Sequence, residues 1–191
     1  TKSEKINPLV VRKYNAPKDS GVNYNRYFYF FEIKLKSIRA SPCAFNYTII
    51  DGTLSSHQFN FTSNIYCSDQ YKIVTFGQLD DSASGMQTID RLRFLEMDLM
   101  IMTGNYGFGY HLDDGRLADR FFNSIEHITA QTVTIIWPGR RESFDNYRMF
   151  QSRFLYPGCD ESTNCKMTLF HDNLVQIHLL NLDQLLLDPK A

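Results

Sequence analysis

Several acidic side chains of this 191-residue chain are spaced so that their oxygens could act together. Asp80-Asp81 and Asp113-Asp114 offer neighbouring carboxylates, and carboxylate oxygens are the ligands that Ca²⁺ prefers. Neither pair has the spacing of a calcium loop, and Asp-rich turns are often only turns. Glu96 and Asp98 would share one face of a strand about 7 Å apart, a separation that two carboxylates of a glycoside hydrolase can have. Solvated outward residues are the commoner explanation, so no metal site is assigned.

Other side chains with reactive groups form no recognisable catalytic pattern. The histidines form neither an H-x-H nor an H-E-x-x-H motif of metal ligands. They are His57, His111, His127, His171 and His178. Ser84-Gly85 lacks the strand and helix context of a nucleophile elbow. The sequence therefore predicts a protein that is not an enzyme, with no catalytic residue and no cofactor.

Four cysteines are present, and their number is even. Four cysteines allow three pairings, and the simplest joins Cys43 to Cys67 and Cys159 to Cys165. Zinc binding is the alternative role for these cysteines, because Cys159, Cys165 and His171 follow one another at intervals of six residues. The paired cysteines of structural zinc sites are usually separated by only about two to four residues, so disulfides are favoured and no metal is expected.

Two glycosylation sequons support an oxidising compartment. They begin at Asn46 and Asn60, and together with the even cysteine count they favour the secretory pathway. The chain begins at Thr1 rather than Met, as a trimmed chain would. We therefore expect a secreted protein, or one on the extracellular side of the cell surface. An intracellular protein with four buried thiols stays open as the alternative.

The composition is that of an ordinary globular protein. Hydrophobic residues make up 43% and charged residues 21%, which excludes disorder, and the length predicts a single domain over 1–191. The net charge of −1 argues against a nucleic-acid partner. No apolar run reaches 18 residues, so no membrane insertion is expected.

Most segments of the chain have the pattern of strands. Residues 27–36 fit a half-buried strand, in which apolar and charged side chains alternate from Phe31. Residues 71–76 and 131–137 are rich in β-branched residues and fit strands as well. Residues 93–102 also fit a strand, with the even-numbered side chains facing outward. Further strands are expected at 44–50, 53–61, 106–112, 116–122, 147–155, 166–171 and 174–180, with hairpin turns at Asp51-Gly52 and at residues 113–115.

Only one helical turn is expected, at residues 124–128. Nine or ten short strands without long helices predict an all-β fold. We expect a two-sheet antiparallel β-sandwich with extra N- and C-terminal segments. Its core would span about residues 26–138, followed by a C-terminal extension over 139–191.

The order of these segments resembles a galectin carbohydrate-recognition domain. The similarity rests on residues 44–50, 54–61, 71–76, 94–115 and 121–137, which is about half of the chain. The resemblance implies a jelly-roll sandwich of two sheets. It also implies a sugar site in which imidazole, amide and guanidinium groups bind hydroxyls and a Trp stacks on the sugar.

The galactoside site that the resemblance implies is degenerate in this chain. His57 matches the family's histidine, but Phe59 and Phe61 stand where Asn and Arg are needed. Asn60 has suitable chemistry but faces the opposite side of the strand. Residues 82–87 replace the family's Trp-containing segment and carry neither Trp nor Arg. Ordinary lactose binding is therefore not expected.

This interpretation favours two classes of function. The first is a secreted or ectodomain binding module that recognises an extracellular protein in adhesion, as a receptor or in extracellular assembly. The second is a lectin of altered, non-lactose glycan specificity, with a site built from His57, Asn60, Asp80, Asp81 and Gln87. A homo-oligomer is kept open for either. A hydrolase acting through Glu96 and Asp98 is a third, weaker option.

Overall fold

The computed structural model describes residues 6, 8, 10–15, 25–31, 44–62, 70–107, 111–144, 147–154, 167–171 and 176–179. The chain divides into two compact units. The first unit comprises residues 1–35, 109–117 and 138–191, and the second comprises residues 36–108 and 118–137.

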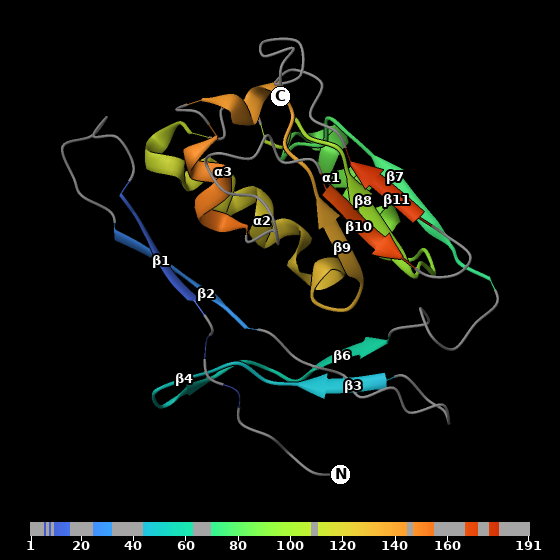
Figure 1. Cartoon of the computed structure of the whole chain (residues 1–191), viewed down its shortest axis with the longest axis horizontal. Helices are drawn as coiled ribbons and strands as arrows, with labels where there is room; N and C mark the ends of the chain where they lie inside the picture. Colours follow the sequence, from blue (N-terminus) through green and yellow to red (C-terminus); the bar gives the residue numbers. More distant parts are fainter. Residues whose placement is uncertain are drawn as a thin grey trace. The chain divides into compact units, whose positions relative to one another are not determined.

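A three-stranded parallel sheet forms the centre of the second unit (Figure 1). Its strands are β7 (Ile73–Phe76), β8 (Leu99–Met102) and β9 (Val133–Ile136), and β8 lies between the other two. Parallel neighbours need a crossover connection, which a helix usually supplies. Here α1 (Ala83–Leu92) lies between β7 and β8 in the sequence, and α2 (Arg116–Thr129) lies between β8 and β9.

The apolar pattern of each element explains its place in this unit. All four residues of β8 are buried, as expected for the central strand of a sheet covered on both faces. Helix α1 buries Gly85, Ile89 and Leu92, which recur at helical spacing. Helix α2 does the same with Ala118, Phe121, Ile125 and Ile128.

Short antiparallel strands complete the second unit. The strand β3 (Ala44–Tyr47) pairs with β6 (Phe59–Thr62), and β4 (Ile50–Asp51) pairs with β5 (Leu54–Ser55). Gly52 closes the latter hairpin at a φ of 58°, a conformation that glycine adopts at low cost. The Tyr47 hydroxyl donates to the carbonyl oxygen of Ala130 at 2.8 Å and so ties β3 to the turn that follows α2.

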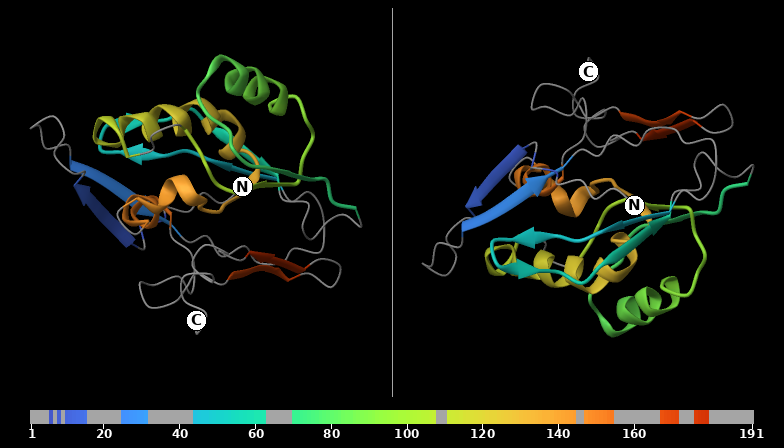
Figure 2. Two further views of the ribbon diagram at one scale, coloured as in Figure 1. Left: turned by 90° about the horizontal axis from the view of Figure 1, so that it is seen from above. Right: turned by 90° about the horizontal axis from the view of Figure 1, so that it is seen from below.

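In the residues described, the first unit contains two antiparallel hairpins and short helices (Figure 2). In one hairpin β1 (Val10–Asn15) pairs with β2 (Asn25–Phe30), and in the other β10 (Met167–His171) pairs with β11 (Gln176–Leu179). The helices are the 3₁₀ turns η1 (Asp113–Gly115) and η2 (Arg140–Ser143) and the short α3 (Arg148–Arg153).

The predicted all-β sandwich is wrong. A parallel sheet with intervening helices is an α/β arrangement, whereas a galectin-like jelly roll is antiparallel throughout. The strand predicted at 93–102 begins only at Leu99, and Met100, expected to face outward, is 1% exposed. Residues 116–122 belong to α2, which extends the single helical turn expected at 124–128 to 14 residues. Residues 148–153 are helical rather than a strand.

Several local predictions are confirmed. Strands occur within 71–76 and 131–137, the Asp51-Gly52 hairpin forms, and the C-terminal segments 166–171 and 174–180 contain a β-hairpin. Among the helices of the described residues, none has the length and apolar character needed to span a membrane. The four cysteines lie outside the described residues, so their predicted pairing stays a prediction.

Candidate functional site at the carboxyl edge of the parallel sheet

The strands β7, β8 and β9 end at one edge of the parallel sheet, and open α/β sheets bind ligands beyond this edge. A glycine followed by an amide residue stands just after two of the strands, as Gly77-Gln78 after β7 and Gly104-Asn105 after β8. The Gln78 backbone N–H donates to the carbonyl oxygen of Gly104 at 2.9 Å. A Cβ on Gly77 would lie 2.8 Å from the Thr103 hydroxyl oxygen. The two loops are therefore in contact, and Gly77 keeps the space that this contact needs.

Both amide residues have left-handed backbone conformations. Gln78 has a φ of 54° and Asn105 a φ of 61°. Asparagine tolerates this region better than most residues, but for glutamine it is uncommon. Strained residues of this kind cluster at ligand-binding and catalytic sites, where the surrounding structure holds them. Gln78 and Asn105 are therefore the leading candidates for ligand contact at this edge.

A buried tyrosine ties the ends of β8 and β9 together. Tyr106 is fully buried, and its hydroxyl oxygen accepts from the Gly104 N–H at 2.8 Å. The same hydroxyl donates toward the carbonyl oxygens of Met102, at 2.5 Å, and of Trp137. The ring stacks on Phe121 of α2 with 6.0 Å between centroids. This network fixes the backbone from which Asn105 projects.

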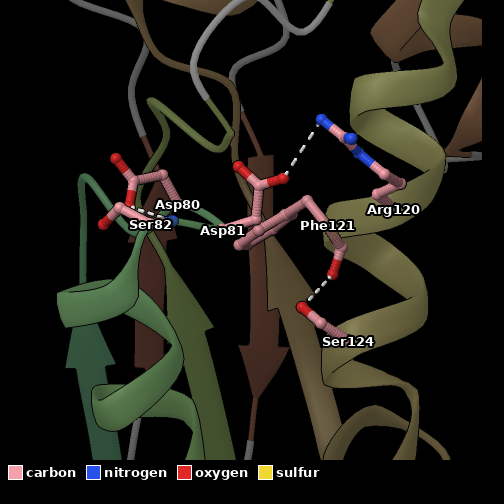
Figure 3. Close-up of polar contacts among 6 residues, drawn as sticks. All are labelled: Asp80, Asp81, Ser82, Arg120, Phe121 and Ser124. Carbon is pink, nitrogen blue, oxygen red and sulfur yellow. Dashed lines mark hydrogen bonds and ion pairs between the residues drawn. The ribbon is translucent and has the colours of Figure 1, made fainter.

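The loop between β7 and α1 holds a buried carboxylate (Figure 3). Asp80 is 8% exposed, and it accepts hydrogen bonds from the backbone N–H of Ser82, at 3.1 Å, and from the Ser82 hydroxyl. Ser82 is the N-cap of α1, and its hydroxyl oxygen accepts from the Gly85 N–H at 3.2 Å. Asp80 thus supports the start of α1.

The neighbouring Asp81 points toward α2 instead (Figure 3). Its carboxylate lies 3.5 Å from the guanidinium of Arg120, whose side chain is 65% exposed. An ion pair of this exposure contributes about 0–1 kcal/mol to stability. Its effect at the site is therefore mainly to balance the charge of Asp81.

The donor set of this edge does not fit a metal ion. Residues 77–82 and 103–107 contain no histidine and no cysteine. Their two carboxylates, Asp80 and Asp81, are engaged by Ser82 and Arg120. Within the part of the chain that the structure describes, no three His, Cys, Asp or Glu side chains come together as metal ligands would. The polar side chains that follow β7 and β8 most closely are instead the amides of Gln78 and Asn105 and the hydroxyl of Thr103.

The five residues predicted to bind a glycan lie on different elements. His57 and Asn60 lie just before and within β6, and both are exposed. Asp80 and Asp81 precede α1, and Gln87 is exposed on that helix. The His57 ring stands over Phe59 with 4.1 Å between centroids. Only the Asp80-Asp81 loop reaches the carboxyl edge of the sheet.

Both sequon asparagines are exposed on the β3–β6 ladder. Asn46 and Asn60 are direct cross-strand partners. Their predicted glycosylation stays a prediction.

The remaining acidic pairs have local structural partners. Glu96 accepts from the Lys72 ammonium at 2.6 Å, and Asp98 accepts from the Lys72 backbone N–H at 2.8 Å. The hydrogen bond and the charge of Lys72 lower the pKa of Glu96. Asp113, in the first unit, forms an ion pair with Arg116. Glu96, Asp98 and Asp113, which the sequence offered as candidates for glycoside hydrolysis or calcium binding, thus each have a structural partner.

Sequence reasoning missed Gln78 and Asn105. Each follows an apolar β-rich run and a glycine, and the repetition of this pattern after two successive strands was the available signal. The signal becomes informative only if the strands are parallel, because only then do both residues lie at the same edge.

The chain is similar in sequence to acid phosphatases. It is 25% identical to acid phosphatase type 7 of Danio rerio over 150 residues, 75% of this chain and 32% of the relative. It is 25% identical to the Mus musculus protein of the same name over 169 residues, 83% of this chain and 37% of the relative. The Homo sapiens protein is 28% identical over 94 residues, 47% of this chain and 21% of the relative. The chain thus spans about a third of the length of the first two relatives.

A solved structure and the family models complete the comparison. A purple acid phosphatase from yellow lupin (Lupinus luteus) seeds aligns with a TM-score of 0.49 and 11% identity, covering 86% of this chain and 38% of that one. No family model matches the chain.

These relatives correct the sequence-based interpretation of identity and function. The resemblance to galectins is wrong, because the relatives are acid phosphatases. Both functions predicted from that resemblance are wrong as well: the binding module of adhesion, receptor or assembly type, and the lectin. The expectation of a non-enzymatic protein is contradicted as well, since every relative named above is an enzyme. The extracellular location and the partners stay predictions.

Proposed function

We propose that this chain is an acid-phosphatase-like domain that binds a phosphate monoester at the carboxyl edge of the β7–β8–β9 sheet. The observation that carries the proposal is the similarity to acid phosphatase type 7 of two species over three quarters or more of the chain. Hydrolysis of a phosphate monoester is the reaction class that this similarity supports.

The geometry of the edge is consistent with this ligand. A phosphate group offers oxygen acceptors, so its site needs N–H or O–H donors. The carboxyl edge provides side-chain amides at Gln78 and Asn105, on loops joined by the bond between Gln78 N and Gly104 O. The Tyr106 hydroxyl holds the second of these loops. Backbone held by these contacts loses little conformational entropy when a ligand binds.

The direct test is ligand binding by the purified chain. Isothermal titration calorimetry with phenyl phosphate, phenyl sulfate and lactose compares three ligand classes on one sample. We expect phenyl phosphate to bind and lactose to give no heat beyond dilution. Phenyl sulfate is the matched control, because it has the same ring and a tetrahedral anion of lower charge. We expect it to bind more weakly.

Turnover is measured separately from binding. Release of inorganic phosphate from phenyl phosphate, above a blank without protein, would show hydrolysis by this chain as well. Absence of phenyl phosphate binding by folded protein would overturn the proposal. Binding of lactose in preference to phosphate would overturn it too.

A further inference from the structure

We infer that the carboxyl edge of the parallel sheet holds the phosphoryl group through the side-chain amides of Gln78 and Asn105, with no metal ion bound there. The inference rests on the proposed function, since it specifies how that ligand would be held. Phosphatases are among the enzymes that commonly use two metal ions to bind the phosphoryl group. The residues that follow β7 and β8 do not fit a centre of two metal ions.

The side chains at this edge have the chemistry of an anion site rather than that of a metal site. Tight protein sites for divalent metals use several carboxylate, imidazole or thiolate ligands. Gln78 follows Gly77 after β7 and Asn105 follows Thr103 and Gly104 after β8, and all of these residues are uncharged. An amide oxygen is a weak ligand, whereas the NH₂ group of an amide donates two hydrogen bonds. The edge is therefore better suited to an oxyanion than to a cation.

The two acids of the loop after β7 already have protein partners. Asp80 is buried and accepts from the backbone N–H and the hydroxyl of Ser82. Asp81 lies against Arg120. Recruiting Asp80 Oδ1 to a metal would compete with its hydrogen bonds from Ser82, the N-cap residue of α1. Recruiting Asp81 would leave the Arg120 charge without this partner. Both acids already have protein partners, and residues 77–82 and 103–107 contain no further acid, histidine or cysteine that would complete a metal site with them.

The backbone has an uncommon conformation at both amide positions. The positive φ of Gln78 and of Asn105 places both residues in a conformation that costs free energy unless the surrounding structure holds it. The bond between Gln78 N and Gly104 O joins the two loops directly. The backbones of the two residues are therefore linked, so both amides lie on contacting loops at one edge of the sheet.

The test is calorimetry of the chain with inorganic phosphate, before and after exhaustive treatment with EDTA. Metal content is measured by mass spectrometry on the same samples. We expect the affinity for phosphate to stay within about twofold after chelation, a change much smaller than the loss of one hydrogen bond to a charged ligand would cause. We also expect far less than one equivalent of Fe, Zn, Mn or Mg per chain.

Glycine variants test the two amides without adding backbone strain. Glycine adopts positive φ readily, so Gln78→Gly and Asn105→Gly remove the side chain and keep the conformation. Each is expected to weaken phosphate binding by about tenfold, the effect of losing one hydrogen bond to a charged group. Gln87→Ala is the control, because Gln87 is an exposed glutamine on α1. It should bind phosphate like the parent chain.

A charge variant at Asn105 gives an independent readout. Asn105→Asp keeps the size of the side chain and replaces a donor by a negative charge. It should weaken metal-free phosphate binding more than Asn105→Gly does, since the carboxylate repels the anion. Folding of every variant is checked by urea unfolding followed through the fluorescence of Trp137, the single tryptophan.

The outcomes separate this inference from the proposed function. Phosphate binding that disappears with EDTA, together with about one or more metal ions per chain, would overturn the metal-free site and leave the phosphate ligand standing. Full affinity in both folded glycine variants would overturn the assignment of Gln78 and Asn105. Absence of phosphate binding with and without metal would overturn the proposed function and this inference together.

Discussion

The buried hydroxyl of Tyr106 donates to the carbonyl oxygen of Trp137, and this contact joins the loop after β8 to the end of β9. The same hydroxyl accepts from the Gly104 N–H, in the loop that also accepts from Gln78. One side chain thus connects the ends of all three parallel strands, directly or through Gly104. The geometry of the proposed phosphate site depends on it.

Tyr106→Phe should therefore destabilise the chain while preserving the packing of the ring. The variant leaves the buried Gly104 N–H without the hydroxyl acceptor, and an unsatisfied buried donor costs about 1–3 kcal/mol. Urea unfolding monitored by Trp137 fluorescence measures the loss. Tyr47→Phe is the matched control, since the part-buried Tyr47 hydroxyl contacts the Ala130 carbonyl. Its loss should be smaller, about 0.5–1.5 kcal/mol. Equal losses in the two variants would contradict a special role for Tyr106.

Gly85→Ala should disrupt the beginning of α1. A Cβ at this position would lie 2.0 Å from the Asp80 carbonyl oxygen and 2.7 Å from its Oδ1, so the loop or the helix must move. Overpacking of this kind costs about 1–3 kcal/mol. Ser84→Ala, in the same turn but exposed, should change the free energy of unfolding by less than about 0.5 kcal/mol. A fully stable Gly85→Ala protein would show that the Asp80 loop is not packed against α1 as described.

Lys72→Met should raise the pKa of Glu96 back toward its ordinary value. The hydrogen bond from Lys72, followed by its charge, lowers that pKa in the parent chain, and the same contact raises the pKa of Lys72. Carboxyl ¹³C NMR titration of the two proteins measures the difference. High salt should shrink it, because both side chains are exposed. An unchanged Glu96 pKa in the variant would exclude the contact in solution.

The signs of these two shifts define a pH window for the pair. The lowered pKa of Glu96 means that its stabilising effect is present above its unfolded-state pKa and is lost as the pH falls through the folded-state value. The raised pKa of Lys72 means that its effect is lost only as the pH rises through the folded-state value. The pair should therefore have no effect on the shape of the stability curve around neutral pH.

Tyr47 should ionise at a higher pH than an exposed tyrosine. Burial, and then the charge of Glu126, raise its pKa. The contribution to stability is present below the unfolded-state pKa and is lost as the pH rises through the folded-state pKa. Near-ultraviolet absorbance titration, with Tyr47→Phe identifying the signal, measures the shift. Glu126→Gln should reduce it only in part, because burial is the larger cause. Complete loss of the shift in Glu126→Gln would contradict that order of causes.

The sequence by itself determined the local strand propensities and one turn. Residues 71–76 and 131–137 are β-branched apolar runs that form β7 and β9, and Asp51-Gly52 forms a hairpin because glycine accepts a positive φ there. These features depend on neighbouring residues only. They do not depend on which strand pairs with which.

Only the tertiary structure decided that the strands run parallel and that helices connect them. β7 lies at the edge of the sheet and alternates in burial, so its pattern resembles that of a strand in an antiparallel sandwich. The buried face of α2, with Ala118, Phe121 and Ile125, lies in a segment rich enough in phenylalanine and isoleucine to be taken for strands. Gln78 and Asn105 lie in contacting loops because parallel strands bring their carboxyl ends to one edge, a pairing that separations along the chain do not specify.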